Sequence, residues 1–259
     1  MKKILLAVLI TLISATSLFA ASKTIIVGVT PFPHKDIMLI AKELLAKQGY
    51  NLVIKEFTDY VTPNTALAEK SLNANFFQHI PYLENMNKEK KLGLTWVAKV
   101  HIEPLGLYSK KIKNLSDIKN GAQIAIPNDA TNCARALRLL EKNGLIKVKK
   151  GELITAKDII DNPKKIKFRE LDAAQLPRTL QDVDAAVINT NFAVEAKLVP
   201  SKDAIVIEGK DSPYANVIAV READKNNPEI KALVKAVNSK EVKAYIIKNL
   251  VPKGIVPAF

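Results

Sequence analysis

The chain has 259 residues, of which 48% are hydrophobic and 25% are charged, and this balance excludes a disordered or fibrous protein. The formal charge of +13 raises the question of a nucleic-acid partner. The lysines are spread along the whole chain, however, only 6% of the residues are aromatic, and no nucleic-acid-binding motif occurs. We therefore expect a solvated, lysine-rich surface and no nucleic-acid partner.

The N-terminal twenty residues have the pattern of a secretory signal. Lys2 and Lys3 precede an apolar run over 4–13, and a small-residue cleavage site ends at Ala20. The alternative is a membrane anchor, but spanning a bilayer takes about 20 apolar residues and this run is far shorter. The sequence therefore predicts a cleaved signal peptide and a soluble, periplasmic mature protein that begins at Ala21.

In chain order, short apolar runs then alternate with stretches of helical periodicity. Up to residue 108, we expect strands at 24–29, 52–57, 75–77 and 97–100, helices at 36–48, 64–72 and after Pro81, and an apolar stretch at 105–108. From residue 115 the alternation resumes, with strands at 123–126, 185–188, 205–207 and 217–220 and helices at 131–142, near Asn191, at 228–237 and at 240–250.

Repeated β–α alternation predicts mainly parallel sheets covered by helices, with ligand sites at the carboxyl ends of the strands. The interruption between the two series predicts two α/β lobes. The expected boundaries are a signal peptide at 1–20, a discontinuous first lobe at 21–108 plus 213–259, and a second lobe at 109–212.

Motifs for catalysis are scarce. The chain has no phosphate-binding loop, no dinucleotide fingerprint and no Gly-x-Ser-x-Gly elbow, so we expect neither an enzyme nor a cofactor. His34, His79 and His101 lack the local pair spacing of metal ligands, which leaves a metal receptor as an alternative only. Cys133, the single cysteine, is expected to be a buried small hydrophobe rather than a nucleophile.

Seven segments of the mature chain stand out as a set. They are Val29-Thr30-Pro31 with His34, and the stretches 75–83, 106–111, 125–137, 174–178, 185–191 and 211–217. In this order they resemble the NlpA lipoprotein family, the methionine-binding receptors of ABC importers, over nearly the whole mature chain. The resemblance implies a two-lobed periplasmic binding protein fold of type II, with the ligand cleft between the lobes.

The resemblance also implies a function. The ligand would be methionine, with the L-enantiomer favoured, and the partner an ABC importer permease with its ATPase; we expect a monomer. A methionine-containing dipeptide or another apolar amino acid are the alternative ligands, and a metal receptor or a periplasmic enzyme are the more distant alternatives. Family members carry a lipid on a cysteine just after the signal, where this chain has Ala20 and Ala21.

Arg135 is the first candidate for the ligand carboxylate. A guanidinium fork early in the helix at 131–142, near its positive N-terminal end, suits an anion. Arg138 lies three positions along and could share the same face, so periodicity alone also allows two surface arginines. The resemblance places the carboxylate clamp at Arg135.

The other candidates are polar amides and rings. Asn191 and Asn216 suit the α-amino acid end of a ligand, although each could instead serve a turn or a cap. The resemblance assigns the side-chain pocket to Tyr60, Phe77 and His79, with Tyr82 and His101 as additions. Aromatic faces suit a thioether. Gln78 alternates with its neighbours on an extended segment and is expected to point the opposite way.

The first testable prediction concerns export. The mature protein is expected to begin at Ala21 and to carry no lipid, because a cleavage site ends at Ala20 and the residue directly after it is not a cysteine. The intact mass of the exported protein measures this directly. A mass that includes diacylglycerol, or an uncleaved chain in the membrane fraction, would contradict the prediction.

Overall fold

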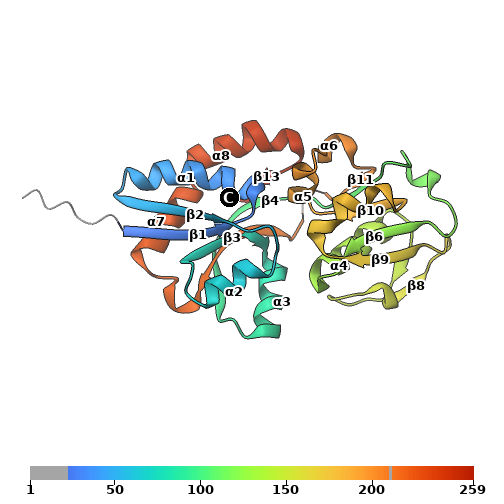
Figure 1. The fold of residues 1–259 in the computed structure, drawn as a ribbon, viewed down its shortest axis with the longest axis horizontal. Coiled ribbons are helices and arrows are strands. Elements are labelled where there is room, and N and C mark those ends of the chain that lie inside the picture. Colours follow the sequence, from blue (N-terminus) through green and yellow to red (C-terminus); the bar gives the residue numbers. More distant parts are fainter. Residues whose placement is uncertain (1–22, 210–211) are drawn as a thin grey trace, which may run out of the picture.

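The computed structural model describes residues 23–209 and 212–259, so the predicted signal peptide and its cleavage site lie outside the described residues. Two lobes lie side by side, each built on its own sheet with helices on both faces (Figure 1). No helix in the described part of the chain is long and apolar enough to cross a membrane.

The first lobe holds a six-stranded sheet in the order β13, β4, β12, β3, β1, β2. The strands are β1 Lys23–Val29, β2 Tyr50–Glu56, β3 Ala74–His79, β4 Leu94–Ile102, β12 Ala215–Arg221 and β13 Val256–Pro257. Strand β1 pairs in parallel with β2 and β3, whereas β12 runs antiparallel to both β3 and β4.

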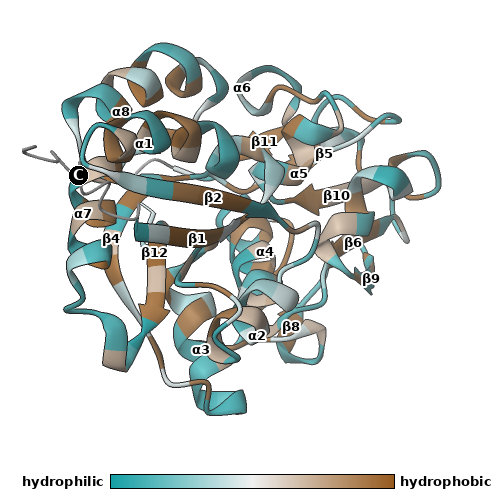
Figure 2. Ribbon diagram, turned by 60° about the vertical axis from the view of Figure 1, so that its left-hand side comes forward, coloured by the Kyte–Doolittle hydropathy of each residue, from teal (hydrophilic) through white to brown (hydrophobic). Residues whose placement is uncertain are grey.

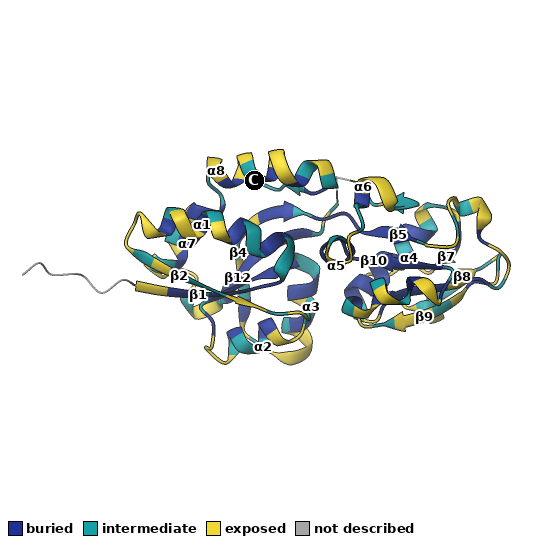
Figure 3. Cartoon of the chain, turned by 45° about the horizontal axis from the view of Figure 1, so that its top comes forward, coloured by how far each residue is buried: buried dark blue, intermediate teal, exposed yellow. Residues whose placement is uncertain are grey.

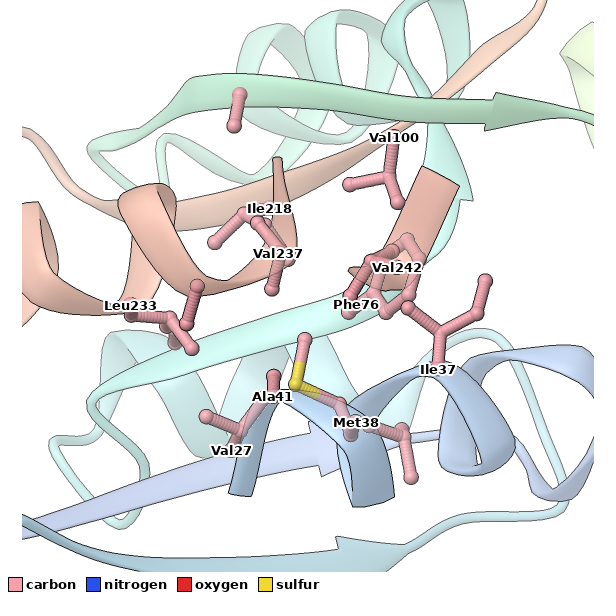
Figure 4. Close-up of a cluster of buried hydrophobic side chains, with 14 of the residues drawn as sticks. Val27, Ile37, Met38, Ala41, Phe76, Val100, Ile218, Leu233, Val237 and Val242 are labelled. Atoms are coloured by element: carbon pink, nitrogen blue, oxygen red, sulfur yellow. The ribbon is translucent and has the colours of Figure 1, made fainter. Parts of the chain in front are cut away.

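Alternating side chains of β12 bury both faces of this sheet. Ile218 packs with helices α1 (Asp36–Ala46), α7 (Pro228–Val237) and α8 (Lys240–Tyr245), and Val217 packs on the other face with α2 (Thr62–Ala68) and α3 (Ile80–Lys90). Figure 4 shows the first of these cores, where Met38 of α1 lies between Phe76 of β3 and Val27 of β1. Burial of each such side chain contributes roughly 1.5–3 kcal/mol to folding.

The second lobe holds a five-stranded sheet in the order β11, β5, β10, β6, β9. The strands are β5 Gly106–Tyr108, β6 Gln123–Pro127, β9 Lys167–Leu171, β10 Ala185–Ile188 and β11 Val206–Ile207. Helix α4 (Ala130–Lys142) packs on one face, and the helical segment Ala173–Gln181 and α5 (Thr190–Glu195) pack on the other. The short elements are β7 Lys147–Val148, β8 Ile159–Asp161 and α6 Pro200–Asp203.

Most of the apolar runs read from the sequence are inner strands of the two sheets. Strands β1 and β10 are largely brown in the hydropathy colouring of Figure 2, and the sheets are mostly dark blue in the burial colouring of Figure 3. Their continuous hydrophobicity follows from helices covering both sheet faces. The predicted two-lobed α/β fold is confirmed by this architecture.

The boundary predicted at residue 108 is corrected by the sheet pairing. Strand β5 hydrogen-bonds with β10 and β11, so Tyr108 lies inside the second lobe rather than at the end of the first. The chain passes from the first lobe to the second at residues 103–105, between β4 and β5, and it returns to the first lobe between β11 and β12. Strand β5 has three residues, and its partner strands lie about 80 to 100 positions further along the chain. The local sequence therefore does not indicate to which lobe it belongs.

Four further predictions are corrected. The sheets are mixed rather than mainly parallel, because β5 and β12, which adjoin the crossovers, run antiparallel to their neighbours. Strand β9 was not expected, since its sequence Lys-Phe-Arg-Glu-Leu lacks an apolar run; it forms the edge of its sheet and is only partly buried. Helix α2 ends at Ala68, earlier than expected, and β3 extends to His79.

Candidate ligand-binding site

A cavity lies between the two lobes and contains about 370 Å³ of empty space, open solvent included. Both lobes and the first crossover contribute to its wall. The lining residues are Tyr60, Phe77, Gln78, His79, Tyr82, Glu103, Leu105, Asn132, Arg135, Asn189, Thr190, Asn191 and Asn216.

One part of the cavity wall is a cluster of aromatic rings. The ring of Tyr60 lies 5.9 Å from that of Phe77, 6.0 Å from that of Tyr82 and 5.0 Å from that of Phe192, measured between centroids. Tyr82 donates from its hydroxyl to the Tyr60 carbonyl at 2.9 Å, which fixes the two rings relative to each other. Such a wall suits an apolar or thioether side chain.

Arg135 supplies positive charge to the same cavity. Its Nε donates to Glu208 at 3.0 Å, its Nη2 donates to the Glu103 carbonyl at 2.7 Å and also to the Glu208 carboxylate, and its guanidinium carbon lies 4.1 Å from the centre of the Tyr214 ring. No described residue accepts from Nη1. Arg135 is therefore held rigidly while its Nη1 stays available to a ligand.

The two arginines of α4 have different surroundings. Arg135 is 3% exposed, whereas Arg138 is partly exposed and donates to the carbonyls of Gly151 and Glu152. Arg135 lies in the second turn of the helix rather than the first. The effect of the helix dipole fades beyond the first turn, so the prediction that the dipole favours an anion at Arg135 is wrong.

A chain of amides runs along the second-lobe wall. Asp129, the N-cap of α4, accepts from Nδ2 of Asn132 at 3.0 and 3.1 Å. Oδ1 of Asn132 then faces His79 Nε2 at 3.1 Å and accepts from Asn189 Nδ2 at 2.9 Å. This chain joins β3 of the first lobe to α4 and α5 of the second.

His79 is a neutral donor in this chain. Its Nδ1 accepts from the backbone N–H of Tyr82 at 3.1 Å, so Nε2 carries the proton that faces Asn132. Burial, assisted by the nearby Arg135 charge, lowers the pKa of His79 to about 3.

The two predicted asparagines also have fixed partners. Asn191 Oδ1 accepts from the Tyr60 hydroxyl at 2.6 Å, and Asn216 Oδ1 faces Nε2 of His34 at 3.1 Å. Asn191 takes no side-chain part in capping α5. The alternative in which the Asn191 side chain caps the helix is therefore not what the structure shows.

His101 does not line the cavity, which corrects its place among the candidates. It is fully buried on β4, with Nε2 at 2.7 Å from a Glu103 oxygen that also lies 3.3 Å from Nε2 of His34. Burial lowers the pKa of His34 to about 4 and that of His101 to about 3, and it raises the pKa of Glu103.

These three side chains are the described group that comes nearest to a metal site, with ligand atoms within 4.8 Å of one another. The contacts of Glu103 with His101 at 2.7 Å and with His34 at 3.3 Å account for their arrangement. His79, the third histidine of the metal hypothesis, bonds with Asn132 instead. The histidines therefore do not converge as that hypothesis required.

Comparisons with known proteins agree with this geometry. A family model described as NlpA lipoprotein matches residues 25–259. The chain belongs to the NlpA lipoprotein family. D-methionine-binding lipoprotein MetQ of Escherichia coli K12 is 43% identical over 221 residues, which cover 83% of this chain and 82% of that protein. Outer membrane lipoprotein 3 of Mannheimia haemolytica is 47% identical over 220 residues, 83% of each chain.

Solved structures extend the match to three dimensions. The structure of a nutrient binding protein from Burkholderia cenocepacia bound to methionine has a TM-score of 0.88 and 48% sequence identity, and it covers 91% of this chain and 100% of that one. An ABC transporter periplasmic substrate-binding protein from Coxiella burnetii has a TM-score of 0.86 and 48% identity over 90% of this chain and 100% of that one.

Within this NlpA family chain, seven of the eight site residues read from the sequence line one cavity: Tyr60, Phe77, His79, Tyr82, Arg135, Asn191 and Asn216. Sequence reasoning missed Glu103, Asn132 and Asn189. Asn189 stands two positions before Asn191, and Glu103 follows β4 at the crossover, so both were within reach of a search around the predicted strand ends.

Gln78 was expected to point away from the side of Phe77 and His79. It does contribute to the cavity wall, but its amide bonds with Asn64 and Asn75, at 2.7–3.0 Å. The functional groups of this side chain are therefore committed to the interior of the first lobe.

Proposed function

We propose that this chain is the substrate-binding receptor of an ABC importer, that it captures methionine between its lobes and that it delivers the ligand to a membrane permease with its ATPase. The observation that supports this most is that Arg135 and the aromatic cluster open into the same cavity. One cavity can therefore bind both the carboxylate and the apolar side chain of a small amino acid.

Arg135 would hold the carboxylate through its free Nη1 edge, and Tyr60, Phe77 and Tyr82 would surround the thioether. Charge-assisted hydrogen bonds contribute roughly 1.5–3 kcal/mol each, so a few of them with ring packing support micromolar affinity or better. The Burkholderia cenocepacia relative was solved with methionine bound, which supports the choice of ligand. No chemical step is required, because binding and lobe closure carry the function.

Selectivity tests the proposal. Calorimetry on ligand-stripped protein is expected to show methionine bound at least about tenfold more tightly than alanine, because alanine leaves the ring cluster unfilled. Glutamate should bind more weakly still, since its second carboxylate would lose water against apolar rings. Equal affinities for the three, or tight binding of a divalent metal alone, would contradict the methionine assignment.

A further inference from the structure

Strand β3 is irregular where it passes the ligand cavity. Its pairing with β12 places Gln78 opposite Val217. The next pair in the register joins Phe76 to Ile218, so Phe77 has no partner in β12. One extra residue on one strand of an antiparallel pair is a β-bulge, and a bulge changes the direction in which the neighbouring side chains point. The bulged residue, Phe77, also belongs to the aromatic wall of the cavity.

The bulge brings two amide side chains to one face of the sheet. In a regular strand, residues three positions apart point to opposite faces. Asn75 and Gln78 are three positions apart, yet both bond with Asn64 of helix α2. Phe76, between them, packs on the other face with α1 and α7. With regular pairing, Gln78 would join Phe76 and would place an amide in that apolar core at a cost in free energy.

The side chains of Asn64, Asn75 and Gln78 form a closed network, which we call the amide triad. Asn64 Oδ1 accepts from Asn75 Nδ2 at 2.8 Å and from Gln78 Nε2 at 2.7 Å, and Asn64 Nδ2 donates to Gln78 Oε1 at 2.8 Å. Gln78 Nε2 also donates to Asn75 Oδ1 at 3.0 Å. The Pro63 carbonyl can only accept, so its contact with Asn75 Nδ2 at 3.2 Å fixes the orientation of that amide and, through it, of the other two.

The amide triad is buried and connects two segments that carry cavity rings. None of its three residues is more than 3% exposed, and a buried polar network with its partners in place specifies one arrangement of the chain. Phe77 stands between Asn75 and Gln78, and Asn64 follows Tyr60 by four positions. The triad therefore ties the helix that follows Tyr60 to the strand that carries Phe77, and the centroids of these two rings lie 5.9 Å apart.

We propose that Asn64 and Asn75 are positioning residues for selectivity: they hold the bulge at Phe77, and they thereby set the spacing of the Tyr60 and Phe77 rings that receive the thioether. Neither asparagine lines the cavity, so both act through the rings. The inference rests on the proposed methionine receptor function and deepens it. A triad that served folding alone would leave the relative affinities for different ligands unchanged.

The experiment compares two ligands that differ only in the side chain. Methionine and alanine share the ammonium and the carboxylate, and only methionine reaches the ring cluster. Calorimetry on ligand-stripped protein is expected to show that Asn64→Ala lowers the methionine affinity at least about tenfold and the alanine affinity less than about threefold. His79 keeps its own bonds with Asn132 and with the Tyr82 N–H, so the part of the wall outside the triad stays in place.

A spectroscopic signature reports on the rings directly. Methionine with an isotope-labelled methyl group is bound to the protein, and the ring currents of Tyr60 and Phe77 shift the methyl resonance away from that of free methionine. Asn64→Ala is expected to move this resonance toward the free position, because Phe77 leaves its place beside Tyr60. A loss of stability alone does not move the resonance of the molecules that remain folded.

A second variant and a matched control accompany Asn64→Ala. Asn75→Ala leaves the reciprocal bonds of Asn64 and Gln78 intact, so it should show the same pattern at a smaller size, and it decides the question if Asn64→Ala does not fold. The control is Asn73→Ala: Asn73 stands directly before β3, does not line the cavity, and accepts through Oδ1 from the Ile26 N–H at 2.7 Å. It should lower the melting temperature and leave both affinities and the methyl resonance unchanged.

The outcomes separate the inference from the function beneath it. Unchanged methionine affinity in the folded variants of the triad, equal losses for methionine and alanine, or a methyl resonance that keeps its wild-type position would each overturn the positioning role while leaving the receptor in place. A wild-type protein that does not bind methionine would instead refute the proposed function itself.

Discussion

Replacing Arg135 with alanine is expected to lower the affinity for methionine at least about a hundredfold. The guanidinium is 3% exposed and would meet the ligand carboxylate in the cavity between the lobes. Removing one member of a buried charge pair costs about 3–5 kcal/mol, and 1.4 kcal/mol is a tenfold change in affinity. Arg135→Lys should rescue only part of the binding, because an ammonium cannot reproduce the planar fork. Calorimetry measures all variants.

Two controls isolate the binding effect. Arg138→Ala, on the same helix, should change affinity little, because among the described residues Arg138 bonds with the carbonyls of Gly151 and Glu152 and does not line the cavity. Arg135→Ala also leaves Glu208 unpaired, so the double variant Arg135→Met/Glu208→Gln removes both charges and should recover thermal stability without recovering binding. Unimpaired methionine binding by folded Arg135→Ala would show that the carboxylate is held elsewhere.

The ligand-free protein is expected to lose several kcal/mol of stability between pH 7 and pH 5. His34, His79 and His101 are buried with folded pKa values of about 4, 3 and 3, below the ordinary value of 6.5. The unfolded chain therefore takes up protons first, and stability falls as the pH drops below 6.5 toward the folded values. Each histidine contributes a loss of roughly 2 kcal/mol at pH 5, at 1.4 kcal/mol per pH unit.

Glu103 acts in the opposite direction, since burial raises its pKa and the folded state binds its proton more readily. The net loss is therefore smaller than the sum over the histidines. Urea denaturation at pH 7.5, 6 and 5 gives the slope, and His101→Gln, which removes one titrating group outside the cavity wall, should make the slope shallower. A flat profile, or the same slope in both proteins, would contradict a set of neutral buried histidines.

The sequence predicts the fold best where a segment is long and periodic. Helix α4 was expected at 131–142 and runs over Ala130–Lys142, because its buried face repeats over three turns. The lobe of strand β5 could not be predicted in the same way, since three residues show no periodicity and the partner strands β10 and β11 are remote in the sequence. The edge strand β9 was not predicted, because its side chains stay partly exposed to water and its sequence therefore lacks an apolar run.

At the site, residue chemistry combined with the family resemblance identified Arg135 and the rings. It overlooked Asn189, whose amide orientation depends on a hydrogen-bond chain that begins at Asp129 in another segment. His101 does not line the cavity, since its orientation toward Glu103 depends on the packing of β4 against Phe76 and His34. Contacts of this kind form only when distant segments meet.

The most direct test of the account is the identity of the molecule that the protein carries. The exported protein is purified without added ligand and denatured, and the small molecules released are identified by mass spectrometry on a chiral column. The account predicts methionine at close to one molecule per chain, with less than about a tenth as much from Arg135→Ala prepared in the same way. Release of a different molecule, such as a dipeptide or a divalent metal, at the same stoichiometry would contradict it.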